Sequence, residues 1–335
     1  MPTAASRRWC DVTLRWGVAG PGGIAARFAE GMRLVDDGAI VAVASRSIAR
    51  ADAYGDKFGV ANRYGSYEDL AADPDVDVVY VATPHSRHEH DTLMFVEAGK
   101  HVLCEKPFAL NARQARRMVD AARARGVFLM EAMWSRFLPA YRALGDVLAD
   151  GRIGELVVVE ADFGFRLPVM PEHRLFDPSL GGGALLDLGV YPVQLCSLVL
   201  GTPDRVVADG SIGVTGVDEH VAGVLHHAGG SLGVVKAAIR ASLRCTARIS
   251  GSDGWVELPA FMHCPDAISV GTARGVEHVD AAFDGDGLRF QVGEVHRCIT
   301  DGRTESDVMP LSETLTIMAT LDAMRAQIGV VYPGE

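Results

Sequence analysis

A glycine-rich run near the start of the chain has the composition of a phosphate-binding turn. It reads Gly20-Pro21-Gly22-Gly23-Ile24-Ala25 and matches G-x-G-x-x-A, between an apolar run and a segment with helical spacing. Glycines at these positions let the backbone turn tightly and approach a pyrophosphate, and the N-terminus of the following helix adds N–H donors. The motif alone is weak, but its place in a β-α-β unit predicts a dinucleotide site. The alternative is a glycine turn without a ligand.

The end of the next predicted strand carries an arginine where an NAD enzyme usually has an acid. That acid lies about 20 residues after the glycines and binds the ribose 2′-hydroxyl. Here the strand ends in Ser45-Arg46-Ser47. The planar guanidinium of Arg46 suits a 2′-phosphate, a serine hydroxyl can donate to it, and Arg50 is a second candidate clamp. This favours NADP over NAD, although Arg46 could also be a surface residue at a helix start.

Lys106 is the first candidate for chemistry on a substrate. It stands between Glu105 and Pro107, directly after the apolar run 101–104. A lysine at the C-terminal end of a parallel strand lies at the edge of the sheet where ligands bind. A buried ammonium there can hold a substrate oxygen or lower the pKa of a neighbour, and Glu105 can orient it. These three residues alone do not specify a function.

The elements that would position these groups alternate along the first half of the chain. Apolar runs of strand length occupy residues 15–19, 40–44, 76–82, 101–104 and 127–130, and helical spacing occupies residues 24–35, 48–58 and 91–99. A further helix is expected from Asn111, an N-cap with Gln114 three residues on, to Gly126. The alternation predicts a parallel sheet covered on both faces.

The second half has a different texture. Strand-like stretches separated by Gly and Asp turns occupy residues 156–163, 206–209, 221–226, 232–238, 247–249 and 254–258. They predict one large, mostly antiparallel sheet with few helices. A final helix is expected over residues 313–328, with Ser312 as its N-cap.

The length of 335 residues fits about two domains. We therefore predict an α/β protein with four parts. They are a loose N-terminal tail (1–13), an NADP-binding Rossmann domain (14–135), an α+β substrate domain with an open-faced sheet (136–311), and a C-terminal helix and tail that packs back on the core (312–335).

Four segments resemble the Gfo/Idh/MocA oxidoreductase family and occur in the family's order over almost the whole chain. They are residues 20–25, Thr83-Pro84 with His88, Glu105-Lys106-Pro107, and the glycine-rich stretch 181–191. Residues 103–107, 130–137 and 329–333 look like the branch of dimeric dihydrodiol dehydrogenases, also described as NADP-dependent D-xylose 1-dehydrogenases. The resemblance implies a Rossmann domain, a C-terminal open-faced sheet, and a homodimer formed through the exposed sheet face.

The resemblance also implies three catalytic residues. The family's lysine, aspartate and tyrosine fall on Lys106, Asp187 and Tyr191. A spacing of four residues puts Asp187 and Tyr191 on one face if their segment is helical. A tyrosine with an ordinary pKa near 10 is a poor base at neutral pH, and the Lys106 ammonium would favour its phenolate. Tyr191 could instead be a core tyrosine, and Asp187 a helix-start acid.

The resemblance also implies that several aromatic residues and an arginine line the pocket. Trp134, Arg136 and Phe163 would surround the nicotinamide and the substrate, and Phe283 would close the site. Each could equally be an ordinary core residue. Where the dihydrodiol branch has a tryptophan before a Cys-Pro pair, this chain has His263. That departure puts an aromatic diol in doubt and leaves a polar substrate open.

The histidines between residues 85 and 90 could be mistaken for a metal site. They lack a convincing set of partner ligands, so we expect no metal. The resemblance instead makes Thr83, Pro84, His85 and His88 residues of a loop on the cofactor side.

Charge and composition narrow the partners. The net charge of −11 is uneven, because residues 1–150 hold 19 basic and 19 acidic residues, whereas residues 151–335 hold 13 and 24. An acidic second half argues against nucleic acid or an anionic membrane and mildly favours a small neutral substrate. The acidic second half could also be a solvated surface.

Three further observations indicate a cytoplasmic protein. No secretory signal is evident, no apolar run has the roughly 18–20 residues of a membrane helix, and the six cysteines form no CxxC pair.

The sequence thus predicts an NADP-dependent oxidoreductase. It would move a hydride between the cofactor and a CH–OH carbon, either C1 of a xylose-like aldose or a carbon of a vicinal diol such as a trans-dihydrodiol. The rivals are a nucleotide-sensing regulator of the same fold and a sugar-binding protein without turnover. Either could dispense with Lys106 and Tyr191, and this chain has both.

Overall fold

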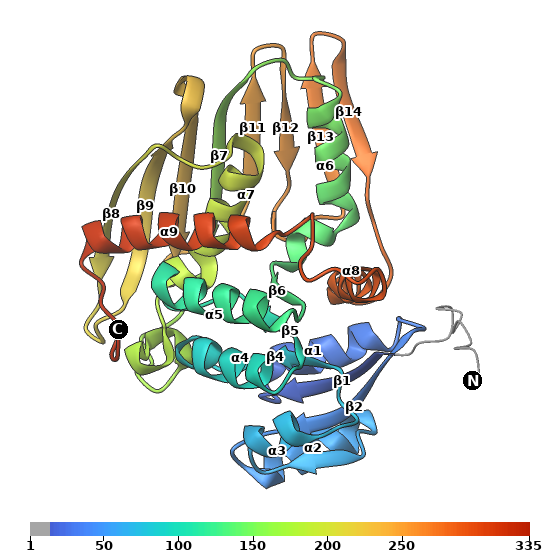
Figure 1. Cartoon of the computed structure of the whole chain (residues 1–335). Coiled ribbons are helices and arrows are strands. Elements are labelled where there is room, and N and C mark those ends of the chain that lie inside the picture. The colour runs from blue at the N-terminus through green and yellow to red at the C-terminus, as the bar shows by residue number, and fades with distance from the viewer. Residues whose placement is uncertain (1–13) are drawn as a thin grey trace.

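The computed structural model describes residues 14–335, and the first part of this range forms a parallel sheet (Figure 1). Its strands pair in the order β3-β2-β1-β4-β5-β6. They are β1 (Leu14–Ala19), β2 (Gly38–Ala44), β3 (Asn62–Tyr64), β4 (Val78–Val81), β5 (His101–Glu105) and β6 (Leu129–Ala132). The helices between them are α1 (Gly23–Met32), α2 (Ile48–Phe58), α3 (Tyr67–Ala72), α4 (His88–Glu97) and α5 (Ala112–Arg125). The predicted Rossmann architecture is confirmed, and its strand order reverses between β1 and β4, where such sheets bind ligands. The tail predicted for residues 1–13 lies outside the described range.

Of the two helix N-caps predicted from the sequence, one is confirmed and one is wrong. The Asn111 side chain accepts a hydrogen bond from the Gln114 backbone N–H at 2.9 Å, so the predicted cap of α5 is confirmed. The predicted Ser312 cap is wrong, because α9 (Leu311–Ile328) begins two residues before the predicted start at residue 313 and directly follows Pro310. The Glu305 carboxylate accepts from the Leu311 N–H at 3.0 Å instead. A cap supplied by a residue six positions upstream has no simple sequence signature.

The second half forms one eight-stranded sheet with the order β14-β13-β12-β11-β7-β10-β9-β8. The strands are β7 (Leu156–Gly164), β8 (Arg205–Ile212), β9 (Asp218–His226), β10 (Leu232–Ala238), β11 (Ala247–Gly251), β12 (Gly254–Leu258), β13 (Ala267–Thr272) and β14 (Gly275–Asp280). Only β7 and β10 pair in parallel, so the mostly antiparallel sheet is confirmed. The sequence did not reveal β13 and β14. Strand β14 is an edge strand whose residues are nearly all exposed, so it lacks alternating apolar residues.

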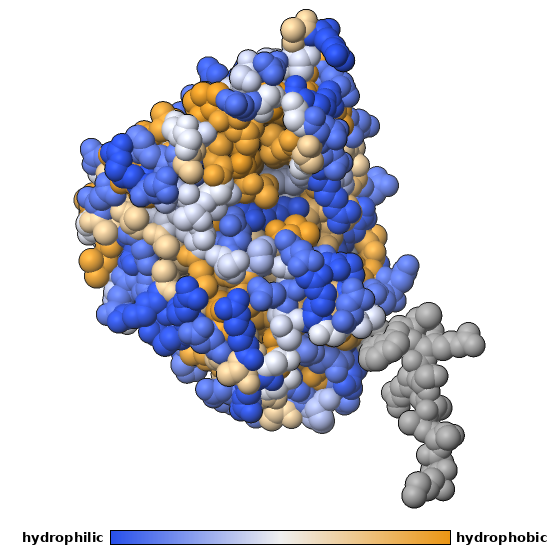
Figure 2. Space-filling view, turned by 45° about the horizontal axis from the view of Figure 1, so that its top comes forward, coloured by the Kyte–Doolittle hydropathy of each residue, from blue (hydrophilic) through white to orange (hydrophobic). Residues whose placement is uncertain are grey.

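Three helices cover one face of this sheet: α6 (Pro139–Ala149), α7 (Val190–Leu200) and α9 (Figure 1). Several apolar side chains on its strands remain exposed, among them Val207 at 45% and Val276 at 55%. Figure 2 shows apolar residues gathered in the upper part of the molecule, toward this sheet, and a more hydrophilic surface below. The sheet therefore keeps apolar surface that the described helices do not bury.

Helix α8 (Leu288–Thr300) follows the second sheet in the chain but packs against the first domain. The Trp16 indole N–H of β1 donates to Nε2 of His296 at 2.9 Å, and the other ring nitrogen of His296 lies 2.7 Å from the Asp37 carboxylate. The imidazole must therefore carry its proton on Nδ1 to satisfy both partners. This contact fixes the substrate domain against β1, near the start of β2.

The segment Pro178–Leu200 is long and apolar enough to cross a membrane by length and composition, although the sequence analysis expected no such run. It is 83% buried within the fold, as expected for a core helix. Its first turns are irregular, because Leu185–Gly189 forms a π-helical turn that continues into α7. π-turns of this kind occur often at functional sites.

Candidate active site

A cavity of about 760 Å³ lies at the carboxyl ends of the parallel strands and extends to the start of α7. It brings together most of the predicted site residues. Those that line it are Gly20, Gly22, Gly23, Ile24, Ser45, Arg46, Arg50, Thr83, Pro84, His85, His88, Glu105, Lys106, Trp134, Asp187, Tyr191 and His263. Segments from both halves of the chain thus form one continuous site.

The glycine turn has the shape of a phosphate cradle. Gly20 has a φ of +90°, and a Cβ there would lie 2.8 Å from the Ala82 carbonyl oxygen, so only glycine fits. A Cβ on Gly22 or Gly23 would meet nothing within 4 Å, and no side chain of residues 14–335 caps the first N–H groups of α1. Those N–H groups are therefore free to bind an anion. The fit to a dinucleotide is good.

The predicted role of Ala25 needs correction. Its side chain is fully buried, and its carbonyl oxygen accepts from the Tyr54 hydroxyl at 2.9 Å. Ala25 therefore lies beneath the cradle, where a small side chain lets α1 pack closely on the sheet, and it does not line the cavity.

The end of β2 carries the cations expected for a 2′-phosphate. Arg46 and Arg50 are both exposed, and neither forms an ion pair with any of residues 14–335. The Ser45 hydroxyl accepts from the Ser47 N–H at 3.3 Å and can still donate. Two unpaired guanidinium groups beside a hydroxyl suit a dianionic phosphate. Sequence reasoning missed Tyr67, which lines the same end of the cavity from α3.

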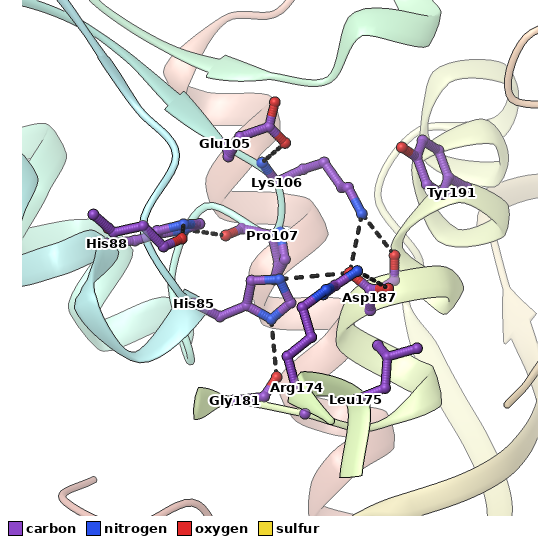
Figure 3. Close-up of polar contacts among 12 residues, drawn as sticks. His85, His88, Glu105, Lys106, Pro107, Arg174, Leu175, Gly181, Asp187 and Tyr191 are labelled. Carbon is purple, nitrogen blue, oxygen red and sulfur yellow. Dashed lines mark hydrogen bonds and ion pairs between the residues drawn. The ribbon is translucent and has the colours of Figure 1, made fainter. Parts of the chain in front are cut away.

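Asp187 is the centre of a charged cluster at the other end of the cavity (Figure 3). The Lys106 ammonium donates to the Asp187 backbone carbonyl oxygen at 2.9 Å and to its Oδ1 at 3.3 Å. Arg174 binds both carboxylate oxygens, at 3.0 and 3.1 Å. Nε2 of His85 lies 3.5 Å from Oδ1. The i, i+4 relation to Tyr191 holds in outline, but it crosses from the π-turn into α7.

The surroundings of Asp187 and Lys106 hold both groups charged. Burial by itself would raise the pKa of Asp187, but the charges of Lys106 and Arg174 outweigh it and the pKa is lowered. Burial would likewise lower the pKa of Lys106, but the charge of Asp187 outweighs it and the pKa is raised. Burial lowers the pKa of His85 to about 3, so this imidazole is neutral at pH 7. Asp187 is therefore a charge partner and a poor proton donor.

Tyr191 faces the same end of the cavity beside Lys106 (Figure 3). Its hydroxyl oxygen accepts from the Trp134 indole N–H at 3.1 Å, and the Lys106 Nζ lies 4.9 Å from the centre of its ring. Burial raises the pKa of Tyr191, and Lys106 only partly opposes this. Lys106 therefore acts in the expected direction, toward the phenolate, but burial outweighs it and the hydroxyl keeps its proton at neutral pH.

His263 is the polar member of an aromatic wall. Its ring centre lies 4.5 Å from that of Phe163, 5.0 Å from that of Tyr191 and 5.6 Å from that of Trp134. Burial, with smaller contributions from Lys106 and Arg27, lowers its pKa to about 4, so the ring is neutral. Its Nδ1 is buried without a partner among residues 14–335. Phe163 supports the wall from behind and does not itself line the cavity.

Two predicted pocket residues lie away from the cavity. Arg136 is only 5% exposed and donates to Gln194 at 2.9 Å and to Glu313 at 2.6 Å, which ties it to α7 and α9. Phe283 packs edge-on against Phe290 at 5.3 Å between ring centres. Both therefore stabilise the packing around the site, because their side chains are used in contacts within the protein.

Loop residues around Lys106 fix its position. Both ring nitrogens of His88 lie 2.8 Å from backbone carbonyl oxygens, one of Thr83 and one of Pro107. Glu105 accepts from the Tyr80 hydroxyl at 2.5 Å, and burial raises the pKa of its carboxyl. His88 thus joins the cofactor-side loop to the turn that carries Lys106, and Glu105 joins that turn to β4. Among residues 14–335 no group of three His, Cys, Asp or Glu side chains could hold a metal ion.

Sequence reasoning missed two arginines that line the cavity. Arg27 lies in α1, pairs with Asp286 at 2.8 Å and stacks on Trp134 at 5.1 Å from the ring centre. Arg174 lies in the irregular stretch between β7 and α7. Neither belongs to a motif, so only the fold shows that they reach the site. Leu180 also lines the cavity and was not predicted.

Comparison with known proteins matches both halves of the chain to one family. Residues 14–133 match the model described as an oxidoreductase family with an NAD-binding Rossmann fold, and residues 141–257 match the GFO/IDH/MocA C-terminal domain. The chain is 40% identical to trans-1,2-dihydrobenzene-1,2-diol dehydrogenase of Mus musculus over 97% of its own length and 99% of the relative's. It is 39% identical to the Homo sapiens enzyme of the same name, with the same coverage of both chains.

Solved structures resemble the whole fold. A 3-ketoreductase from Actinomadura kijaniata, in complex with NADP and TDP-benzene, has a TM-score of 0.85 at 26% identity and covers 94% of this chain and 98% of its own. An aldose-aldose oxidoreductase from Caulobacter crescentus, complexed with glycerol, has a TM-score of 0.84 at 26% identity and covers 94% and 97%.

Proposed function

Since the chain belongs to the GFO/IDH/MocA oxidoreductase family, we propose that it is a dehydrogenase that transfers a hydride between NADP and a CH–OH carbon. The substrate is a vicinal diol or C1 of an aldose. The observation that carries the proposal is the Lys106–Asp187 pair beside Tyr191, in the same cavity as the glycine cradle. The resemblance to dihydrodiol dehydrogenases supports the diol, and the fold of the aldose-aldose oxidoreductase supports the sugar.

The cradle, Arg46 and Arg50 would hold the cofactor, with the buried and unpartnered Thr83 hydroxyl as a further contact. The bound nicotinamide supplies or accepts the hydride. Because the 2′-phosphate distinguishes NADP from NAD, the two unpaired arginines support NADP. The NADP complex of the Actinomadura kijaniata relative agrees with this preference.

Lys106 and Tyr191 together provide two donors for one substrate oxygen. An ammonium has three N–H donors, and Lys106 uses two of them on Asp187, which leaves one. The Tyr191 oxygen accepts from Trp134, so its own proton is free to point into the cavity. Donors arranged in this way stabilise negative charge that develops on the oxygen. Tyr191 can give its proton to that oxygen when a carbonyl is reduced. When an alcohol is oxidised, Tyr191 must first lose its proton to solvent, and the phenolate then takes the proton of the alcohol as the hydride leaves.

A substrate screen tests this proposal. Purified protein would be incubated with NADP and a panel of aldoses, cyclic vicinal diols and an arene trans-dihydrodiol, and NADPH fluorescence would be followed. We expect turnover with at least one member and at least about a hundredfold less with Lys106→Met. An absence of turnover with every member, while NADP still binds, would leave a nucleotide-binding protein and contradict the proposal.

We also propose a homodimer formed through the exposed face of the eight-stranded sheet. Exposed apolar side chains on its strands, such as Val207 and Val276, support this, because a second copy could bury them. A cytoplasmic location is a further proposal. The five described cysteines are free thiols, which fits a reducing compartment, and Cys10 lies outside the described residues.

A further inference from the structure

The C-terminal tail reaches back to the glycine-rich segment that leads into α7. It contains residues 329–333, one of the segments that carry the family resemblance. Tyr332 is 2% exposed, and its hydroxyl donates to the Gly182 carbonyl oxygen at 2.7 Å. Figure 1 shows the C-terminus beside the segment between β7 and α7. The tail therefore ends in contact with the support of the active site.

Glu335 fastens the tail from the outside. Its carboxylate accepts from the Asn111 side-chain amide at 2.8 Å and from the Tyr332 N–H at 2.9 Å, and it forms an ion pair with Arg325. The Arg325 guanidinium also lies over the Tyr332 ring, 5.3 Å from its centre. Since these partners belong to the start of α5 and the end of α9, Tyr332 is held by two helices.

The turn at residues 181–183, which Tyr332 contacts, is fixed by two further residues. Nδ1 of His85 lies 2.9 Å from the Gly181 carbonyl oxygen, so this nitrogen carries the proton of the neutral ring. The Asp218 carboxylate, from β9, accepts from the Leu185 N–H at 2.6 Å. A Cβ on Gly182 would lie 2.6 Å from the Arg174 carbonyl oxygen, so the turn also packs tightly against the loop that carries Arg174.

We propose that Tyr332 is a positioning residue for the reaction. It fixes the turn at residues 181–183, and this turn sets where Asp187 meets Lys106. Asp187 follows Gly182 by five residues, and the chain between them is helical from Ala184 onward. A small shift of the turn therefore changes the 2.9 and 3.3 Å contacts that hold the Lys106 ammonium. The proposal rests on the proposed dehydrogenase function for its kinetic test, but not for its structural test.

The kinetic test compares Tyr332→Phe with wild type. The ring and its contact with Arg325 stay, and only the hydroxyl is lost. We expect kcat to fall roughly tenfold, because misplacement of reacting groups by about 1 Å can cost a hundredfold. The KM for NADP should stay within about twofold, and the loss of activity at alkaline pH should move to lower pH, because the weaker Asp187 contact supports the charged Lys106 less. Tyr64→Phe, which removes a tyrosine hydroxyl bonded to Asp73 at 2.9 Å, is the matched control and should leave all three unchanged.

The structural test is hydrogen exchange of the free protein followed by mass spectrometry. In Tyr332→Phe the amides of residues 181–189 should exchange faster, while the strands of the parallel sheet stay as in wild type. If no substrate is turned over, this measurement still decides the proposal while the dehydrogenase assignment fails. If Tyr332→Phe does not fold, Glu335→Gln should produce the same changes with smaller size. A stable variant with unaltered kcat, pH profile and exchange in residues 181–189 would overturn the proposal.

Discussion

Asp187 and Lys106 depend on each other for their charge. The carboxylate is nearly buried and has its pKa lowered, whereas the pKa of the ammonium is raised. The lowered pKa of Asp187 contributes stability that is present above its ordinary pKa near 3.9 and is lost as pH falls through the folded value. The raised pKa of Lys106 contributes stability below its ordinary pKa near 10.4, which is lost as pH rises through the folded value.

Asp187→Asn separates this charge from the shape of the site. Without the carboxylate, burial lowers the pKa of Lys106, so the alkaline loss of activity should move to lower pH. The free energy of unfolding at pH 7 should fall by about 3–5 kcal/mol, because one partner of a buried ion pair is left alone. Rate measurements across pH and urea unfolding check both. An alkaline limb in its wild-type position would show that Asp187 does not support the Lys106 charge.

Arg46 is predicted to select the phosphate of NADP. The Arg46→Ala change should raise the Kd for NADP about ten- to a hundredfold, since a charge-assisted contact is worth about 1.5–3 kcal/mol. NAD lacks the 2′-phosphate, so its Kd should hardly change. Fluorescence titration of both cofactors measures the two constants. Equal weakening for NADP and NAD would remove Arg46 from the 2′-phosphate site.

Site residues could be placed from the sequence where they follow a recognisable secondary-structure element. The glycine turn, Arg46 and Lys106 could be placed from the sequence because each follows a recognisable apolar strand of a parallel sheet. Arg174 could not, because it belongs to no motif and begins a short 3-10 helix, Arg174–Phe176, that reaches Asp187 only through the folding of the loop between β7 and α7. The net rise in the Tyr191 pKa was also unforeseen, since burial depends on packing that the sequence does not show.

The turn between β1 and α1 offers a test at this scale. In Gly20→Ala the new Cβ would strain a φ of +90° and lie 2.8 Å from the Ala82 carbonyl oxygen. The turn should shift, and the Kd for NADP should rise at least about tenfold with the parallel sheet intact. Calorimetric titration together with circular dichroism would show this. An unchanged Kd would mean that the cofactor does not rest on this turn.

The whole molecule presents an eight-stranded sheet with helices on one face and exposed apolar side chains on its strands. The architecture could be predicted because the two halves differ in periodicity. The edge strand β14 could not, since its residues are exposed and do not alternate. The placement of α8 against the first domain was not foreseen either, because it rests on the contact between Trp16 and His296, which are far apart in sequence.

The open sheet face predicts a dimer in solution. Light scattering at low micromolar concentration should give twice the chain mass of 35.7 kDa. Val207→Asp should favour the monomer by burying a charge in the interface, whereas Val214→Asp, at a position 91% exposed in the turn after β8, should not. A wild-type protein that remains monomeric would contradict an interface on this sheet.

In the proposed reaction Tyr191 and Lys106 act on one substrate oxygen, and Tyr191→Phe tests this assignment most directly. The ring stays packed against Phe163 and His263, and only the ionisable oxygen is removed. Tyr141→Phe is the control, because that buried hydroxyl also bonds within the protein, to the Met262 carbonyl oxygen at 3.1 Å. The measurement is kcat with the preferred substrate, taken together with the Kd for NADP. We predict that kcat falls by about 10²–10⁴ with Tyr191→Phe, the usual share of general acid–base catalysis, while the Kd for NADP stays within about twofold. A kcat within about threefold of wild type would contradict it and leave Tyr191 a packing residue.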